Sequence, residues 1–194
     1  MAMRFLVIFL AISMIMAPLI HAIPDQTDEA ADKWFKNLPN AKPKSKKLHF
    51  FIHDVAKAPT GQYPSIVPVA QANMTAHSPT QFGVVNVVDD LLTSGPSTSS
   101  KQVGYVEGVY VSSSQKTVSL LVALNFVFTE GKHNGSTLSV LGRIAEFSAN
   151  REFPILGGSG DFKMAQGIAV ANVHSADPKT GNRIVECKFR FLHY

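Results

Sequence analysis

The sequence Arg151-Glu-Phe-Pro-Ile-Leu-Gly-Gly-Ser-Gly-Asp-Phe-Lys-Met-Ala-Gln-Gly-Ile-Ala169 contains three glycines within four residues, Gly157, Gly158 and Gly160. Glycine adopts positive φ angles without a steric penalty and lets two backbones approach closely. Because apolar residues lie on both sides of the Gly-Gly-Ser-Gly tract, we expect a tight corner between β-strands there. Arg151 precedes the corner, and its guanidinium group makes it a candidate to hold an oxygen atom of a ligand.

Strand-like segments occupy most of the chain around this tract. Eight segments rich in β-forming residues cover residues 48–55, 65–72, 82–88, 103–111, 118–128, 137–144, 167–173 and 183–194. Pro68 predicts an edge position or a bulge in the second segment, and Gly104 and Gly108 predict tight curvature or a close backbone approach in the fourth. Strands at this spacing form a sandwich or a closed barrel, and the curvature favours the barrel. We therefore expect an all-β fold of eight strands that can hold one small ligand inside.

The N-terminal part of the chain is expected to lie outside this fold. Arg4 precedes an uncharged apolar run from Phe5 to Ile20, and Ala22 offers a cleavage site, so residues 1–22 are predicted to be a secretory signal peptide. The run is shorter than the roughly 20 residues of a spanning helix, which makes a membrane anchor the less favoured alternative. Residues 23–47 are expected to be a flexible leader with a short helix, and residues 48–194 one domain.

Charge and cysteine content restrict the classes of function. The formal net charge is only +4, and the four lysines between residues 42 and 47 form the only basic cluster. This cluster indicates a solvated linker, with weak attraction to acidic cell-wall polymers as the alternative. No nucleic-acid motif accompanies it. The single cysteine, Cys187, excludes an intramolecular disulfide, and its place on an alternating apolar face predicts a buried thiol.

Several common kinds of site are not predicted. His49 and His53 lie four residues apart on a strand, where their side chains do not converge as on a helix. The chain has no Gly-x-Ser-x-Gly elbow, and no Gly-Lys-Ser/Thr follows the glycine tract as in a phosphate loop. We therefore expect no metal and no cofactor.

The best candidate for chemistry is Asp54, which ends the apolar face of the segment 48–55. Burial on that face should raise its pKa, and such a carboxyl group can donate a proton near neutral pH. Tyr110 shares a strand face with two glycines and could direct its hydroxyl group into the same cavity. The alternative is a plain ion pair between Asp54 and Arg151 beside a packing tyrosine.

Other polar residues fall in predicted turns. Asp89 and Asp90 are expected to cap the turn after residues 82–88, with contact to a ligand at the barrel mouth as the alternative. Asn73 and Asn134 each begin an Asn-x-Ser/Thr sequence in a predicted turn of a secreted chain, so both are expected to carry glycans.

Four segments together resemble the plant dirigent protein family. They are residues 50–54, 82–90, 103–110 and 157–169, and their order and spacing agree with the family from about Leu48 to Tyr194. The resemblance implies an eight-stranded antiparallel barrel like that of allene oxide cyclase. It also implies secretion to the apoplast, glycosylation, a homotrimer or homodimer, and no oxidative centre.

The resemblance also implies a function. In this family a separate laccase or peroxidase makes phenoxy radicals from a monolignol such as coniferyl alcohol, and the barrel directs their coupling to one stereoisomer of a lignan. Lignan-type phenylpropanoid biosynthesis is therefore the leading expectation. The alternatives are ring closure of a quinone methide, as in pterocarpan synthesis, and non-catalytic binding of cell-wall phenolics. Neither a nucleic acid nor a membrane is expected as a partner.

The family motifs assign roles to residues of this chain. Asp54 matches the first functional aspartate, Tyr110 the pocket tyrosine and Arg151 the pocket arginine. The residues expected to contact the substrate are Asp90, Phe50, Ile144 and Glu146.

The chain departs from the lignan-forming members at two positions. Their second catalytic aspartate falls on Ile144 here, and Glu146, two residues further on, is the residue expected to substitute for it. Gln166 replaces a basic residue of those members. The chain therefore resembles the broader dirigent-like subfamily more than the lignan-forming one.

Overall fold

The computed structural model describes residues 26–145 and 151–194 of the chain. The predicted signal peptide, residues 1–22, lies outside the described residues. Two compact units are present, Met1–Lys42 and Pro43–Tyr194. In the first unit, α2 (Gln26–Asn37) confirms the predicted short helix, and the 3₁₀ helix η1 (Leu38–Asn40) follows it. None of the helices in these ranges combines the length and apolar character needed to cross a membrane.

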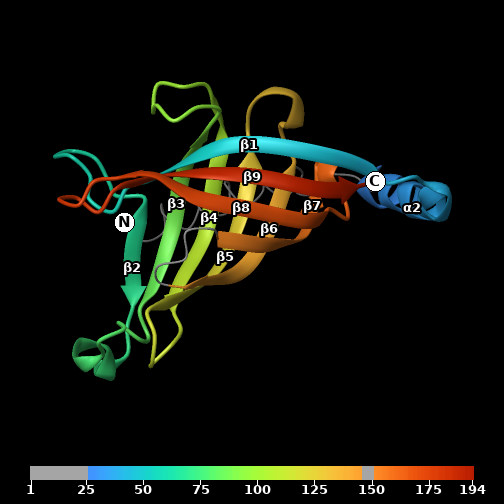
Figure 1. The fold of residues 1–194 in the computed structure, drawn as a ribbon. Helices are drawn as coiled ribbons and strands as arrows, with labels where there is room; N and C mark the ends of the chain where they lie inside the picture. The colour runs from blue at the N-terminus through green and yellow to red at the C-terminus, as the bar shows by residue number, and fades with distance from the viewer. Residues whose placement is uncertain (1–25, 146–150) are drawn as a thin grey trace, which may run out of the picture. The chain divides into compact units, whose positions relative to one another are not determined.

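The second unit is a closed antiparallel β-barrel (Figure 1). Its elements are β1 (Lys44–Asp54), β2 (Ile66–Ala70), η2 (Asn73–His77), β3 (Val85–Thr93), β4 (Gln102–Ser112), β5 (Ser119–Phe128), η3 (Gly131–His133), β6 (Thr137–Ala145), β7 (Arg151–Ser159), η4 (Gly160–Phe162), β8 (Gln166–Ala176) and β9 (Arg183–His193). From β3 to β9 each strand pairs with the next, β9 pairs with β1, and β1 pairs with β3. The ring therefore contains eight strands, and the predicted barrel is confirmed.

The membership of the ring differs from the prediction. β7 is a full barrel strand between β6 and β8, although no strand was predicted there, because Pro154 and the glycines weaken its strand pattern. β2 was counted among the eight but lies beside the ring, where it pairs only with the first part of β3 (Figure 1). The register shift between Pro68 and Ala70 confirms the bulge that Pro68 predicts.

The glycine tract forms the expected corner, but the corner begins later than its first glycine. Gly157 and Gly158 still belong to β7 and pair with Ser139 and Leu138 of β6. The chain turns at η4, where Gly160 adopts a φ of +60°. The predicted close approach on β4 is also confirmed, since a Cβ atom at Gly104 would overlap a carbonyl oxygen of β5.

Two strand limits differ most from the prediction. β1 begins at Lys44, four residues inside the expected leader, because its pairing with β9 continues to Lys44 opposite His193. β3 runs through Asp89 and Asp90 to Thr93, because its last residues pair with β1 and close the barrel. The prediction that these two aspartates cap a turn is therefore wrong, and Asp90 is completely buried.

Aromatic side chains fill the end of the barrel near η4. The ring of Phe162 is fully buried and lies 5.5 Å from that of Phe128 and 5.2 Å from that of Phe191, between ring centroids. Cys187 is buried on the inner face of β9, as predicted. Since this end is packed, the interior has room for a ligand toward the opposite end, where β1 ends and β9 begins.

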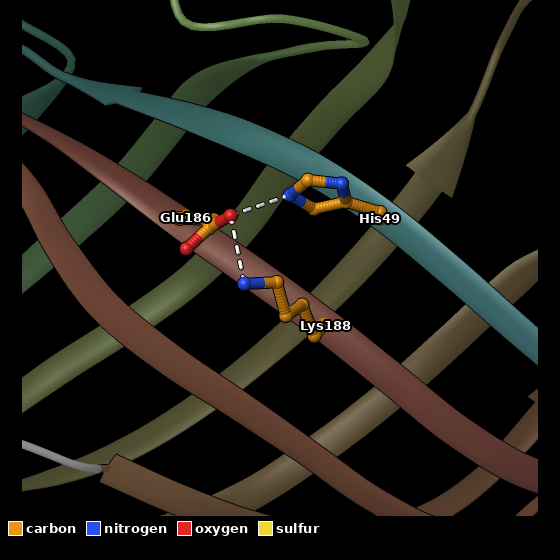
Figure 2. A network of polar contacts seen from close by, with 3 residues as sticks. All are labelled: His49, Glu186 and Lys188. Carbon is orange, nitrogen blue, oxygen red and sulfur yellow. Dashed lines mark hydrogen bonds and ion pairs between the residues drawn. The ribbon is translucent and has the colours of Figure 1, made fainter.

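The outer face of β1 and β9 carries a small polar network (Figure 2). One carboxylate oxygen of Glu186 lies 2.8 Å from His49 Nε2 and 2.9 Å from Lys188 Nζ. The hydrogen bond from Lys188 is the largest of the effects that lower the pKa of Glu186. These side chains lie on the opposite side of β9 from Cys187, which confirms the predicted alternation along residues 185–191.

Candidate functional site

The barrel interior contains a cavity of about 380 Å³, a volume that suits one small organic ligand. Most of its wall is apolar and comes from all eight ring strands and from β2. The apolar side chains include Ile52, Ile66, Leu120, Val122, Leu124, Phe126, Val140, Ile144, Phe153 and Val185. The polar ones are Asp54, Gln81, Asn86, Tyr110, Ser112, Arg151 and Arg183.

Asp54 is the acid of this cavity. It is the last residue of β1, and only 6% of its surface is exposed. Burial raises its pKa to about 6, while the positive charges of Arg183 and Arg151 act in the opposite direction. Burial thus outweighs the two arginines, and the carboxyl group exchanges its proton near neutral pH.

Two arginines share the cavity with Asp54. Arg151 begins β7 and is half-buried, and burial is the largest effect that lowers its pKa, followed by the charge of Arg183. Arg183 begins β9 and is exposed at the rim. No ion pair within 4 Å joins either arginine to another residue in the described ranges. Asp54 and Arg151 thus line the same cavity, and the described residues do not show the plain ion pair that was the alternative interpretation.

Tyr110 contributes a hydroxyl group from β4. Burial raises the pKa of this phenol well above its usual value, and the nearby charges of Asp90 and Asp54 raise it further. Tyr110 therefore stays protonated over the physiological pH range. Among the described residues no side-chain hydrogen bond involves its hydroxyl group. The hydroxyl is thus available to a bound ligand.

Asp90 lies behind the cavity wall and does not line it. The Ser65 hydroxyl donates a hydrogen bond of 2.5 Å to Asp90 Oδ1 and accepts one from the backbone N–H of Val55. Oδ2 is buried and has no hydrogen-bond partner. Burial raises the pKa of Asp90 to about 8, so the group is mostly protonated at pH 7.

The remaining residues expected at the substrate are not all brought together. Ile144 lines the cavity from β6. Phe50 does not line it: its ring packs in the core, 5.4 Å from that of Phe128 and 6.2 Å from that of Phe189 between centroids. Glu146 lies outside the described residues.

The two Asn-x-Ser/Thr sequences lie at the surface. Asn73 begins η2 and Asn134 follows η3, and both side chains are exposed. Within residues 26–145 and 151–194 no three His, Cys, Asp or Glu side chains gather in a way that could hold a metal ion.

Sequence reasoning missed Arg183. The signal was available, because Arg183 continues the apolar face of Val185, Cys187 and Phe189 in the way that Asp54 continues the face of β1. Ser65 was also missed. Its role depends on β2 lying beside β3, a contact that no local pattern predicts.

The arrangement suits a neutral or anionic aromatic ligand. The apolar wall excludes water from a ring, and the polar groups gather toward one end. A carboxyl group with a pKa of about 6 can give a proton to a ligand oxygen and take one back. Two guanidinium groups and a phenol can hold further oxygens. The fold and the site thus define an antiparallel barrel with an inner cavity of small-molecule size, in which Asp54 is the acid among the described lining residues.

Comparison with known proteins agrees with this class. The family model described as "Dirigent-like protein" matches residues 45–192. Pterocarpan synthase 1 of Glycine max is 45% identical over 148 residues, which cover 76% of this chain and 78% of that protein. Dirigent protein 23 of Arabidopsis thaliana is 41% identical over 152 residues, or 78% and 80% of the two chains. This chain belongs to the dirigent family.

A solved structure of the family shows the same fold. The pterocarpan synthase dirigent protein GePTS1 superposes with a TM-score of 0.70 and 40% sequence identity, over 78% of this chain and 89% of that chain. The family resemblance read from the four sequence segments is therefore confirmed.

Proposed function

We propose that this protein directs the stereochemistry of a reactive phenolic intermediate held inside the barrel. One observation carries the proposal. Asp54, a buried acid with a pKa of about 6, lines the same largely apolar cavity as two guanidinium groups and a tyrosine hydroxyl. The barrel holds the intermediate in a fixed orientation, and fixing the orientation of the reacting groups can by itself remove a large part of the activation barrier.

Ring closure of a quinone methide is the reaction that this site supports best. It needs an acid and a base at one position, and a carboxyl group titrating near pH 6 can act as both. Similarity to pterocarpan synthases supports this choice. So does Ile144, which lines the cavity where the lignan-forming relatives are expected to have their second aspartate.

The proposed steps lose one water molecule and involve no oxidation. Protonated Asp54 gives its proton to the departing hydroxyl group of a phenolic benzylic alcohol, which leaves as water. The phenolic proton passes to solvent water, and the quinone methide forms; the same solvent later returns a proton to the quinone oxygen. A second hydroxyl group of the same molecule then adds to the methide carbon. Its proton passes to Asp54, and the quinone oxygen regains a proton to restore the phenol. Tyr110 and Arg151 hold the substrate oxygens, so that one face of the methide is open to attack.

Stereoselective coupling of phenoxy radicals is the second candidate. A separate laccase or peroxidase would generate the radicals, and the barrel would only position them. The apolar wall favours this candidate, because it can hold aromatic rings away from water without contributing any bond-making group.

The setting of this function is part of the proposal. The signal-peptide pattern of residues 1–22 supports secretion to the apoplast, and the exposed side chains of Asn73 and Asn134 are compatible with glycosylation there. By analogy with the family, the working form is a homotrimer or a homodimer.

Two assays on the purified protein test the proposal. In the first, a 2′-hydroxyisoflavanol is incubated with the protein, and the products are separated on a chiral column. In the second, coniferyl alcohol and a laccase are incubated with and without it, and the lignans are separated in the same way. We expect one enantiomer to dominate in the first assay. If one enantiomer dominates only in the second assay, radical coupling rather than ring closure is the function of the protein.

Two variants connect the result to the cavity. Asp54→Asn should abolish the stereochemical effect, whereas Glu152→Gln, an exposed carboxylate next to Arg151, should leave it unchanged. Racemic products in both assays would contradict stereochemical direction and favour a barrel that only binds phenolics. Full activity of Asp54→Asn would contradict the role assigned to Asp54.

A further inference from the structure

The charges that line the cavity do not balance. Among the lining residues that the structure describes, only Asp54, Arg151 and Arg183 carry a full charge, because burial keeps Tyr110 and Cys187 protonated. This described part of the lining therefore contains two positive groups and one carboxyl group. Since the pKa of that carboxyl is about 6, near pH 6 about half of the molecules have no negative charge in the lining.

Arg183 is the less buried of the two arginines, and within residues 26–145 and 151–194 it forms no ion pair within 4 Å. It lies directly opposite Asp54 in the register of β1 and β9, yet no ion pair within 4 Å joins these side chains. Asp177, the acid on the same hairpin, is held within its own turn. Its carboxylate accepts hydrogen bonds from the backbone N–H of Lys179 and from the Thr180 hydroxyl. The guanidinium group of Arg183 thus remains available at the rim.

A guanidinium group at the rim of an apolar cavity matches a particular ligand shape. Its planar set of N–H donors fits the two oxygens of a carboxylate, and the pairing is stronger than a hydrogen bond to a neutral hydroxyl group. An aromatic ring at the other end of the same molecule would contact the apolar wall. A ligand of this kind would also neutralise the excess positive charge of the cavity.

We propose that Arg183 is a specificity-determining residue that selects aromatic substrates carrying a carboxylate and holds that carboxylate at the rim of the barrel. The proposal rests on the function proposed above and names the substrate class of the same cavity. The ring of the substrate lies against the apolar inner strands, and its phenolic end reaches Tyr110 on β4.

The test compares two probes that differ only in one terminal group. Ferulate ends in a carboxylate and coniferyl alcohol in a neutral hydroxyl group, on the same ring and side chain. Isothermal titration calorimetry at low salt should show at least fivefold tighter binding of ferulate to the wild-type protein. Added salt should reduce this preference, because the rim is solvent-exposed. In Arg183→Gln the preference should fall below twofold, with the affinity for coniferyl alcohol little changed.

Two further variants separate selection by Arg183 from other effects. Arg183→Lys keeps the charge and should retain part of the preference. Arg190→Gln removes the same charge from the exposed outer face of the same strand, and it should bind both probes as the wild type does. Thermal unfolding of each variant shows whether the barrel is folded.

Several results would overturn the inference. For the wild type, these results are equal affinity for the two probes or no binding of ferulate. For the variants, they are an equal loss of affinity for both probes in Arg183→Gln, or a loss of the ferulate preference in Arg190→Gln as large as that in Arg183→Gln. Failure of the proposed function looks different. Racemic products together with an Arg183-dependent preference for ferulate would contradict stereochemical direction alone, whereas stereochemical control with equal binding would contradict only the selection.

Discussion

Asp54 and Arg183 are opposite residues in the β1–β9 ladder, and both line the cavity, but no ion pair within 4 Å joins them. A close pair would hold the carboxyl group ionised and lower its pKa below the usual range. Instead the burial of Asp54 outweighs the two nearby arginines, and the pKa is raised to about 6. This separation leaves an acid that can be protonated and a cation that can bind a ligand.

The first prediction concerns Asp54 as the proton donor. Asp54→Asn keeps the shape of the side chain but removes the acid, so the rate of ring closure should fall by about 10²–10⁴-fold. The wild-type rate should decline as pH rises through about 6, because the protonated form is lost there. Rates of product formation between pH 5 and 7.5 provide the measurement. The variant should show no such decline, and a decline at the same pH in both proteins would contradict the assignment.

The second prediction concerns the effect of Arg151 on that acid. The positive charge of Arg151 lowers the pKa of Asp54, so Arg151→Gln should raise it above about 6. The decline in rate with pH should then shift to higher pH, even if the maximal rate also falls. Arg190→Gln on the outer face is the matched control and should leave the profile in place. A shift to lower pH in Arg151→Gln would contradict the electrostatic relationship.

The third prediction concerns Asp90 and the stability of the fold. Its pKa is raised by burial from 3.8 to about 8, so between these values the folded protein binds more protons than the unfolded chain. The free energy of unfolding should therefore decrease as pH rises from about 4 to about 8. The asparagine of Asp90→Asn cannot ionise, so the variant should lose less stability over this pH range than the wild type does. We expect the difference to exceed about 1 kcal/mol, a conservative threshold because one pKa unit corresponds to about 1.4 kcal/mol.

Urea unfolding at pH 5 and pH 8 measures this difference. Asp89→Asn is the control, since Asp89 is the exposed neighbour on the same strand, and its pH dependence should stay close to that of the wild type. The prediction fails if Asp90→Asn loses as much stability as the wild type between the two pH values.

The predicted and the missed parts of the site differ in what determines them. Asp54 was found because it ends an alternating face, which is a local property of the sequence. The same alternating pattern on β9 includes Arg183. Its place in the cavity becomes evident only from the pairing of β9 with β1, which sets Arg183 opposite Asp54, a residue 129 positions earlier in the sequence. Asp90 was assigned to a turn, because β3 extends past it only to reach β1 and close the ring.

The barrel fold was easier to predict than the identity of the strands that form its ring. Alternation and curvature glycines are spread over most of the chain and together indicate a barrel. β7 was not predicted because Pro154 and the paired glycines are unusual in a central strand. β2 was counted in the ring because it is rich in β-forming residues, although its Pro68 indicated an edge position or a bulge. Whether a strand belongs to the ring depends on pairing between distant segments, which local sequence does not specify.

The last prediction tests the glycine tract itself, where adjacent residues have different surroundings. A Cβ atom at Gly158 would lie 2.5 Å from the carbonyl oxygen of Phe162 and 2.6 Å from that of Thr137. At Gly157 no atom would lie within 4 Å of it. Gly158→Ala should therefore lower the free energy of unfolding by about 1–3 kcal/mol, because the corner at η4 has to move. Gly157→Ala should stay within about 0.5 kcal/mol of the wild type or be slightly more stable. Urea unfolding of both variants gives the comparison, and equal losses would show that flexibility, rather than close approach, explains this glycine pair.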